Sequence, residues 1–253
     1  MKVFDVWNYN GEPIATARIE YLQDVVDTFI IVEGTHTFTG KPKGSLYFDT
    51  APFRNHPKVR FVKVADVVPG GAWANEAHQR NAPVGLLLSL MGKDDVAICS
   101  DADEIPHAGK MALAAARSAA FGGGCLLEQD FYYYNFNWKN PTPWRNALAL
   151  RKEAVAQYGI QQLRGRLPVG LHSGWHCSYA ESKDNIRRKI ESFSHTECDL
   201  PQWKTEEHLI RCLEQGEDLF GRKEQGWAAA ESSALPEALQ RFNQEIRAAQ
   251  GLQ

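Results

Sequence analysis

The sequence predicts an α/β fold with a mainly parallel central sheet and helices on both faces. Apolar runs of strand length alternate with segments of helical periodicity through the first half of the chain. Residues 28–32 are too continuously apolar to face water on either side, as in a strand covered by two helix layers. A further apolar run, residues 96–99, leads into a cluster of carboxylates. In such sheets ligands bind beyond the carboxyl ends of the strands.

The first half is predicted to hold four strands with helices between them. Asn10-Gly11 and Pro69-Gly70-Gly71 are turn sequences, and a polar loop follows the second strand and runs through Lys43. The predicted strands are residues 2–7, 28–32 and 59–64, with the fourth in the stretch 96–106, and the predicted helices are residues 14–22 and 75–91.

The second half is less regular. An alanine-rich helix at 111–121 ends at three glycines, and a strand with five aromatics follows at 125–137. Residues 139–145 hold two prolines and are expected to be a loop, whose Trp144 could form a platform for a sugar ring. Further strands are predicted at 147–151 and 171–179 and helices at 183–193 and 205–213. The alternating aromatics Tyr132, Tyr134 and Phe136 are expected mainly in the core.

No repeat or linker divides residues 1–221, which are expected to form one domain. The segment 222–253, rich in Ala, Glu and Gln from about Lys223 onward, is predicted to be a peripheral helix or a frayed tail.

Composition limits the possible partners. The net charge of −3, with acidic and basic residues interspersed, does not indicate binding to nucleic acid or to an anionic membrane surface. We find no signal peptide and no membrane span, so a cytoplasmic protein is expected. Five scattered cysteines suit neither a disulfide framework nor a zinc site and are expected to be reduced and mostly buried.

The three carboxylates Asp101, Asp103 and Glu104 lie within four positions. Such crowding is unfavourable unless a positive charge lies among them, and a divalent cation bound through oxygen is the usual solution. We therefore predict a metal site, with Asp103 as the direct ligand and Asp101 touching the metal through water or the ribose of a nucleotide. Glu104 either supports these ligands from behind or caps a helix. Which of the three touches the metal stays open.

Two stretches resemble the signatures of glycosyltransferase family 17: Asp-Asp-Val-Ala-Ile-Cys-Ser-Asp-Ala-Asp-Glu-Ile-Pro at 94–106 and Gly-Trp-His-Cys-Ser at 174–178. Residues 26–33, 38–43, 79–82 and 186–194 support the resemblance, which covers roughly residues 1–221.

The resemblance implies a GT-A fold, with a nucleotide-sugar half at about 1–106 and an acceptor half at 107–221. It implies an inverting transfer from a UDP-sugar, with N-acetylglucosamine the best-known donor sugar, and Mn²⁺ or Mg²⁺ as cofactor. The expected acceptor is a glycan or a lipid-linked precursor, the latter allowing peripheral membrane association. We expect no membrane anchor or stem, and residues 12–18 are more polar than the family pattern suggests.

By the family pattern, His176 completes the metal shell or contacts the diphosphate, and imidazole suits Mn²⁺ better than Mg²⁺. The alternative is a core histidine satisfied by backbone hydrogen bonds. His172 would face the same side of a regular strand and is the alternative ligand. The neighbouring Trp175 is expected to pack in the core.

Besides Asp101, which could touch the ribose, three residues are predicted to bind the nucleotide. Glu33 ends the second strand, where its carboxylate can accept hydrogen bonds from uracil or ribose, unless it is simply solvated. Arg80 is suited to pairing with a phosphate, or forms a surface salt bridge. Lys43, with Lys41 beside it, could close over the diphosphate or remain in water.

An inverting transfer also needs a base to take the proton of the acceptor hydroxyl. Glu128 and Asp130 flank Gln129 on a predicted strand and would share one face; Glu128 is the preferred base and Asp130 its neighbour. Asp184 is the alternative.

Two other functional classes remain possible. One is a carbohydrate-binding relative without catalysis. The other is a metal-dependent nucleotidyltransferase, which predicts a glycine-rich, basic N-terminal loop; residues 9–12 fit that pattern poorly.

Overall fold

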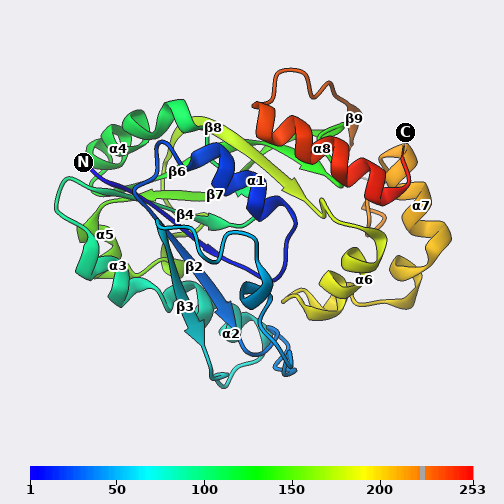
Figure 1. Ribbon diagram of the computed structural model, residues 1–253, viewed down its shortest axis with the longest axis horizontal. Coiled ribbons are helices and arrows are strands. Elements are labelled where there is room, and N and C mark those ends of the chain that lie inside the picture. The colour runs from blue at the N-terminus through cyan, green and yellow to red at the C-terminus, as the bar shows by residue number, and fades with distance from the viewer. Residues whose placement is uncertain (223–225, 253) are drawn as a thin grey trace.

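A nine-stranded sheet forms the centre of the computed structural model, which describes residues 1–222 and 226–252 (Figure 1). Its strands are β1 (Val3–Asn8), β2 (Thr28–Gly34), β3 (Val59–Val64), β4 (Val96–Asp101), β5 (Glu104–Ile105), β6 (Gly124–Tyr133), β7 (Trp138–Leu150), β8 (Val169–Ser178) and β9 (Ala228–Ala229). The helices are α1 (Ile14–Leu22), α2 (Ala72–Asn81), α3 (Val84–Leu90), α4 (Met111–Ala120), α5 (Lys152–Tyr158), α6 (Lys183–Ser192), α7 (Glu206–Gln215) and α8 (Glu237–Gln250).

The sheet has a parallel half and a mixed half. Strands β3, β2, β1 and β4 lie side by side and are parallel, as the alternating sequence pattern predicts. The order then continues β7-β6-β8-β5; β4 and β6 pair antiparallel with β7, β6 and β8 pair in parallel, and β5 pairs antiparallel with β8. The predicted α/β class is confirmed, and the second half adds antiparallel strands to the parallel core.

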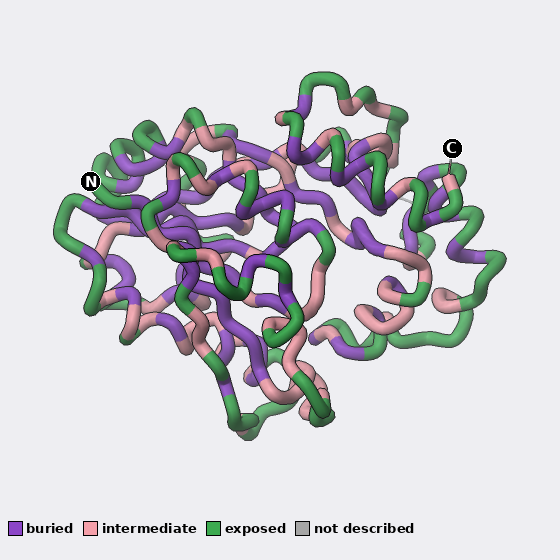
Figure 2. Tube along the Cα trace, in the orientation of Figure 1, coloured by how far each residue is buried: buried purple, intermediate pink, exposed green. Residues whose placement is uncertain are grey.

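Both faces of the parallel half are covered by helices. Alternate residues of β1 enter two different apolar clusters: Val3 and Trp7 pack with α1, α4 and α8, whereas Phe4 and Val6 pack with α3 and α5. The central strands are accordingly buried along most of their length (Figure 2). A third cluster joins the end of β6 to α6 and α7.

Two predicted elements differ from the structure. Residues 139–145, expected to be a loop, belong to β7. Their prolines are tolerated because the β6–β7 pairing shifts register twice near Gln129, and neither Pro141 nor Pro143 is among the paired residues. The helix expected over 75–91 is two helices, α2 and α3, because Pro83 has no N–H to donate to the preceding turn.

The C-terminal segment includes a packed helix. In α8, Leu239, Phe242 and Ile246 are buried in the same cluster as α1, and the two helices lie side by side (Figure 1). The predicted start of this segment near Lys223 falls outside the described residues. Within the described ranges no helix has the length and apolar character needed to cross a bilayer. The cysteines are free and mostly buried, as predicted.

Candidate functional site

The two signature stretches are joined by backbone pairing. Glu104 and Ile105 in β5 pair with His176 and Trp175 in β8, and the Cys177 N–H donates to the carbonyl of Asp103 at 2.9 Å. A turn of three carboxylates and a strand about seventy residues later are therefore held in one fixed arrangement.

Gly174 makes this pairing possible. Its φ is +99°, and a Cβ atom there would lie 2.0 Å from the carbonyl oxygen of Ile105. The strand also holds one extra residue at this point, because Glu128 is opposite His172 whereas Asp130 is opposite Trp175. Because of this bulge, the side chains at positions 172 and 176 face opposite sides of β8 instead of the same side.

His172 and His176 consequently do not share a side of β8, and the expectation of a regular strand is wrong. His172 is exposed and lies 3.2 Å from the Asp130 carboxylate, away from the acidic turn. His176 is only 5% exposed and faces the turn. Trp175 packs between Tyr21 and His107, as predicted for a core residue.

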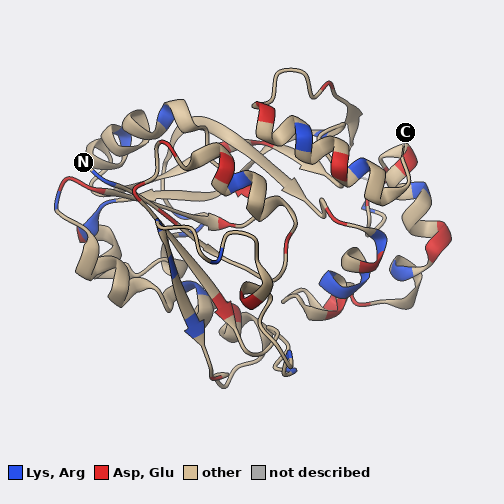
Figure 3. Cartoon of the chain, viewed as in Figure 1, with Lys and Arg blue, Asp and Glu red and all other residues tan. Residues whose placement is uncertain are grey.

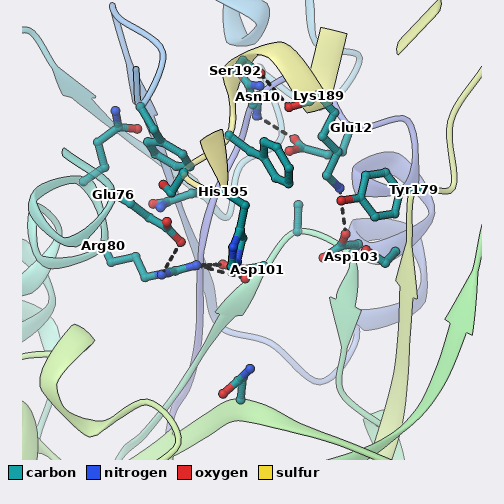
Figure 4. A pocket seen from close by; sticks show the side chains of 18 of the residues that line it. Asn10, Glu12, Glu76, Arg80, Asp101, Asp103, Tyr179, Lys189, Ser192 and His195 are labelled. Carbon is teal, nitrogen blue, oxygen red and sulfur yellow. Dashed lines mark hydrogen bonds and ion pairs between the residues drawn. The ribbon is translucent and has the colours of Figure 1, made fainter. Parts of the chain in front are cut away.

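A cavity of about 490 Å³ lies beyond the carboxyl ends of β1, β2 and β4, the edge where the sheet order predicts a ligand. In Figure 4, Arg80, Glu76 and Asp101 lie on one side of it, and Asp103, Lys189 and Glu12 lie on the other. The predicted site residues that line the cavity are Lys43, Arg80, Asp101, Asp103, Trp144 and His176.

Arg18 holds the backbone of the acidic turn and forms an ion pair with Asp5. It is fully buried, its Nη1 donates to the carbonyls of Asp101 (2.7 Å) and Glu104 (2.9 Å), and its Nη2 donates to Asp5 (2.6 Å). This basic residue makes the first helix more polar than the family pattern suggests. Its signal in the sequence is a charged residue on the apolar face of a helix.

Two further guanidinium groups hold Asp101. Arg80 Nη2 donates to Oδ1 at 2.8 Å and Arg164 Nη2 donates to Oδ2 at 2.9 Å. Burial alone would raise the pKa of Asp101, but Arg164 and Arg80 outweigh that effect and lower the pKa below its usual range. Asp101 is therefore ionised and engaged by the protein's own cations.

Glu104 supports the turn and does not reach the cavity surface. Its Oε2 accepts the Asp101 N–H (2.9 Å), and its Oε1 accepts Trp144 Nε1 (2.6 Å) and Arg164 Nη2 (3.1 Å). The side chain is fully buried, so it orients Asp101, Arg164 and the Trp144 indole at once. This is the supporting role that the sequence left open for Glu104.

Asp103, on the turn, and His176, on the neighbouring strand β8, face each other with atoms that could bind a cation. Asp103 Oδ1 lies 3.5 Å from His176 Nδ1, and that buried nitrogen has no hydrogen-bond partner among the described residues. The His176 ring stacks on Trp144 (4.5 Å between centroids) and on Phe131 (4.9 Å), which fixes its orientation.

Asp103 and His176 suit a cation that binds together with a substrate. In residues 1–222 and 226–252 no group of three or more His, Cys, Asp or Glu side chains is arranged to hold a metal. One carboxylate and one imidazole leave most of the coordination shell to phosphate oxygens and water, which is how Mg²⁺ and related ions commonly bind beside nucleotides.

Glu33 anchors a loop and does not line the cavity. Its carboxylate accepts the N–H groups of Tyr47 (3.0 Å) and Phe48 (2.9 Å) and pairs with Lys43 Nζ at 3.3 Å. Lys43 does reach the cavity, and burial lowers its pKa although Glu33 opposes the effect. Lys41 is exposed.

The predicted bases lie outside the cavity. Glu128 pairs with Arg145 at 2.7 Å, Asp130 pairs with Lys139 at 2.9 Å, and Asp184 is bound to a neighbour on its own helix. None of these three residues is among those that line the cavity. Their role as base stays a prediction.

The lining residues that were missed from the sequence include the charged residues Glu12, Arg164 and Lys189. Arg164 follows a short 3₁₀ turn that no periodic pattern marks. Lys189 lies in the helix that supports the family resemblance, but its position on that helix gives no sign of its role. Glu12 follows the predicted Asn10-Gly11 turn.

The comparison with protein families gives a match to the model described as glycosyltransferase family 17, over residues 1–229. A search of curated proteins finds no match to the chain.

Solved structures with distant similarity include TarS from S. aureus (13% identity, 84% of this chain and 72% of that one, TM-score 0.39). Others are 4-diphosphocytidyl-2C-methyl-D-erythritol synthase from Anaerococcus prevotii (8%, 66% and 79%, TM-score 0.38) and an active-site mutant of LgtC (10%, 98% and 96%, TM-score 0.31).

Proposed function

The chain belongs to glycosyltransferase family 17, and from this premise we propose that it transfers N-acetylglucosamine from a UDP-sugar, with inversion, in a reaction that needs Mn²⁺ or Mg²⁺. A glycosyltransferase uses an activated sugar and an acceptor, and the proposed acceptor is a glycan or a lipid-linked saccharide. Family membership sets the nucleotidyltransferase alternative aside.

The observation that supports the metal is the pair formed by Asp103 and His176. A buried imidazole nitrogen without a hydrogen-bond partner is unfavourable, and here it faces a carboxylate oxygen 3.5 Å away. A divalent cation held by these two groups would neutralise the charge that develops on the leaving diphosphate. Asp101 is less suited to direct coordination because Arg80 and Arg164 already bind its oxygens.

The other residues of the site would position the substrates. Glu104 and Arg164 keep Asp101 and the Trp144 indole in place, and Trp144 lines the cavity where a sugar ring can pack on it. Arg80 also lines the cavity and is within reach of an anionic ligand.

For the base, Glu128 and Asp130 remain candidates from the sequence, whereas the geometry favours Glu12. Glu12 lines the cavity and has no ion-pair partner in the described part of the chain. Burial raises its pKa, as suits a group that must accept a proton near neutral pH.

A thermal-shift experiment tests the donor and the metal together. We expect Mn²⁺ alone to raise Tm little, because the protein supplies two ligands, and Mn²⁺ with UDP or UDP-N-acetylglucosamine to raise it clearly. A ligand at 100 times its Kd stabilises the folded state by about 2.7 kcal/mol. Slow metal-dependent hydrolysis of the UDP-sugar would distinguish the enzyme from a carbohydrate-binding relative without catalysis.

The variants Asp103→Asn and His176→Phe should abolish the Mn²⁺-dependent shift. Phenylalanine keeps a ring in contact with Phe131 and Trp144 and removes the nitrogen ligand. His172→Phe is the matched control, since His172 lies outside the cavity. An equal shift without metal, or an unchanged response in Asp103→Asn, would disprove the metal's role.

A further inference from the structure

We propose that Lys189 binds the diphosphate of the donor and stabilises the leaving group, exchanging its present partner Asp103 for a phosphate oxygen when nucleotide and metal bind. This inference rests on the proposed function, because it assumes a nucleoside diphosphate donor. It adds a cation from helix α6 to a site whose other charged side chains include Arg80, Asp101 and Arg164.

Lys189 is placed in the cavity by a well-anchored helix. Helix α6 begins at Ser182, whose hydroxyl accepts the Asn185 N–H, and Ile186 and Ile190 are almost fully buried. Lys189 projects from this helix into the cavity, and its side chain keeps 22% exposure. Figure 4 shows the ammonium group directed at Asp103. Basic side chains are otherwise interspersed with acidic ones over the fold (Figure 3).

Acidic and aromatic side chains surround Lys189. Its Nζ lies 3.1 Å from Asp103 Oδ2 and 3.8 Å from Glu181 Oε1, and the Tyr179 ring is 5.0 Å away. The cavity thus holds an ammonium group on a flexible four-carbon stem, which can move from one oxygen partner to another.

A metal on Asp103 and His176 changes the electrostatics of this lysine. The ammonium and the divalent cation would then compete for one carboxylate, and like charges at such short range repel strongly in a partly buried site. An anion between them removes the repulsion. The diphosphate of a nucleotide sugar has both the charge and the oxygens to bridge the two cations.

The proposed contact acts on the bond that breaks. The bond between the anomeric carbon and the β-phosphate oxygen breaks, and its electron pair stays on that oxygen. The acceptor oxygen forms the new glycosidic bond and its proton passes to the base, so the products are the glycoside and UDP. An ammonium donor beside the β-phosphate stabilises the charge as it develops.

Calorimetric titration with UDP, UMP and uridine, each in the presence of Mn²⁺, tests the proposal. Lys189→Met should weaken UDP binding by about 10- to 100-fold, the loss of one charge-assisted hydrogen bond, and leave uridine binding unchanged. UMP should show an intermediate or smaller loss. Lys183→Met is the matched control on the same helix, because Lys183 pairs with Glu206 outside the cavity.

Opposite results would overturn the inference. If Lys189 only competes with the metal, Lys189→Met will bind Mn²⁺ more tightly and UDP at least as tightly as the wild-type protein. Unchanged uridine binding shows that each variant is folded. If loss of the lysine leaves Glu181 unpaired and destabilises Lys189→Met, UDP and uridine binding are instead measured on the double variant Lys189→Met with Glu181→Gln and compared with Glu181→Gln alone. Absence of UDP binding by the wild-type protein would instead disprove the proposed donor, and the inference with it.

Discussion

Replacing Gly174 by alanine should separate the two halves of the site. The added Cβ would lie 2.0 Å from the Ile105 carbonyl oxygen and 2.8 Å from the Pro106 Cα, both of them backbone atoms that no rotamer change can move. Strand β5 must therefore shift away from β8. Because Asp103 and His176 are aligned by this pairing, the shift should also separate these two proposed metal ligands.

The cost has two parts. A non-glycine residue with φ near +99° is strained by about 1–3 kcal/mol. Loss of the short β5–β8 ladder removes backbone hydrogen bonds that contribute about 1 kcal/mol each. Together these predict a destabilisation of roughly 3–5 kcal/mol for Gly174→Ala, and a loss of the Mn²⁺-dependent response to UDP even where the protein remains folded.

Urea unfolding and the thermal-shift response to UDP with Mn²⁺ measure the two effects. Gly85→Ala is the control, because a Cβ at Gly85 meets nothing within 4 Å and alanine in the helix α3 should stabilise it by about 0.5–1 kcal/mol. A Gly174→Ala protein with wild-type stability and an intact response to UDP would refute the argument that this close approach aligns the site.

Two further predictions concern the buried charges. Arg18→Met should lower the free energy of unfolding in urea by about 3–5 kcal/mol, because it leaves Asp5 buried without its cation; full stability would contradict this. Burial raises the pKa of Glu181 from 4.5 to about 7, so the folded state binds the proton more tightly than the unfolded state does. This contribution to stability is complete below pH 4.5 and is lost as the pH rises through about 7, and Glu181→Gln should remove that slope from the pH dependence of unfolding.

The parallel half of the sheet was predictable because its sequence pattern is typical of strands buried between two layers of helices. Residues 28–32 and 96–99 are apolar on both faces, and burial between two helix layers is the arrangement that satisfies them. The prediction that residues 139–145 form a loop was wrong, because these residues are held in a strand by irregular pairing with β6. This pairing is a tertiary feature, and the two prolines in the sequence point instead to a loop.

The site was only partly predictable. Asp103 and His176 could be paired through the family signatures, and the structure brings them together. His172 could not be excluded from the sequence, because the bulge at Gly174 depends on the close approach of Ile105, a residue far away in the chain. Glu33 was correctly placed at the sheet edge, but its engagement by a loop backbone is invisible to any local pattern.

The crowding of Asp101, Asp103 and Glu104 has a different explanation from the one the sequence suggests. Arg80, Arg164 and Lys189 pair with the three carboxylates, so the acidic turn is neutralised by the chain itself. Crowded carboxylates therefore do not by themselves require a metal in this fold. In the proposed function the need for a cation arises when a diphosphate enters, because its charge adds to that of the turn. Asp103 is the position proposed to hold such a cation, beside the His176 nitrogen that has no hydrogen-bond partner among the described residues.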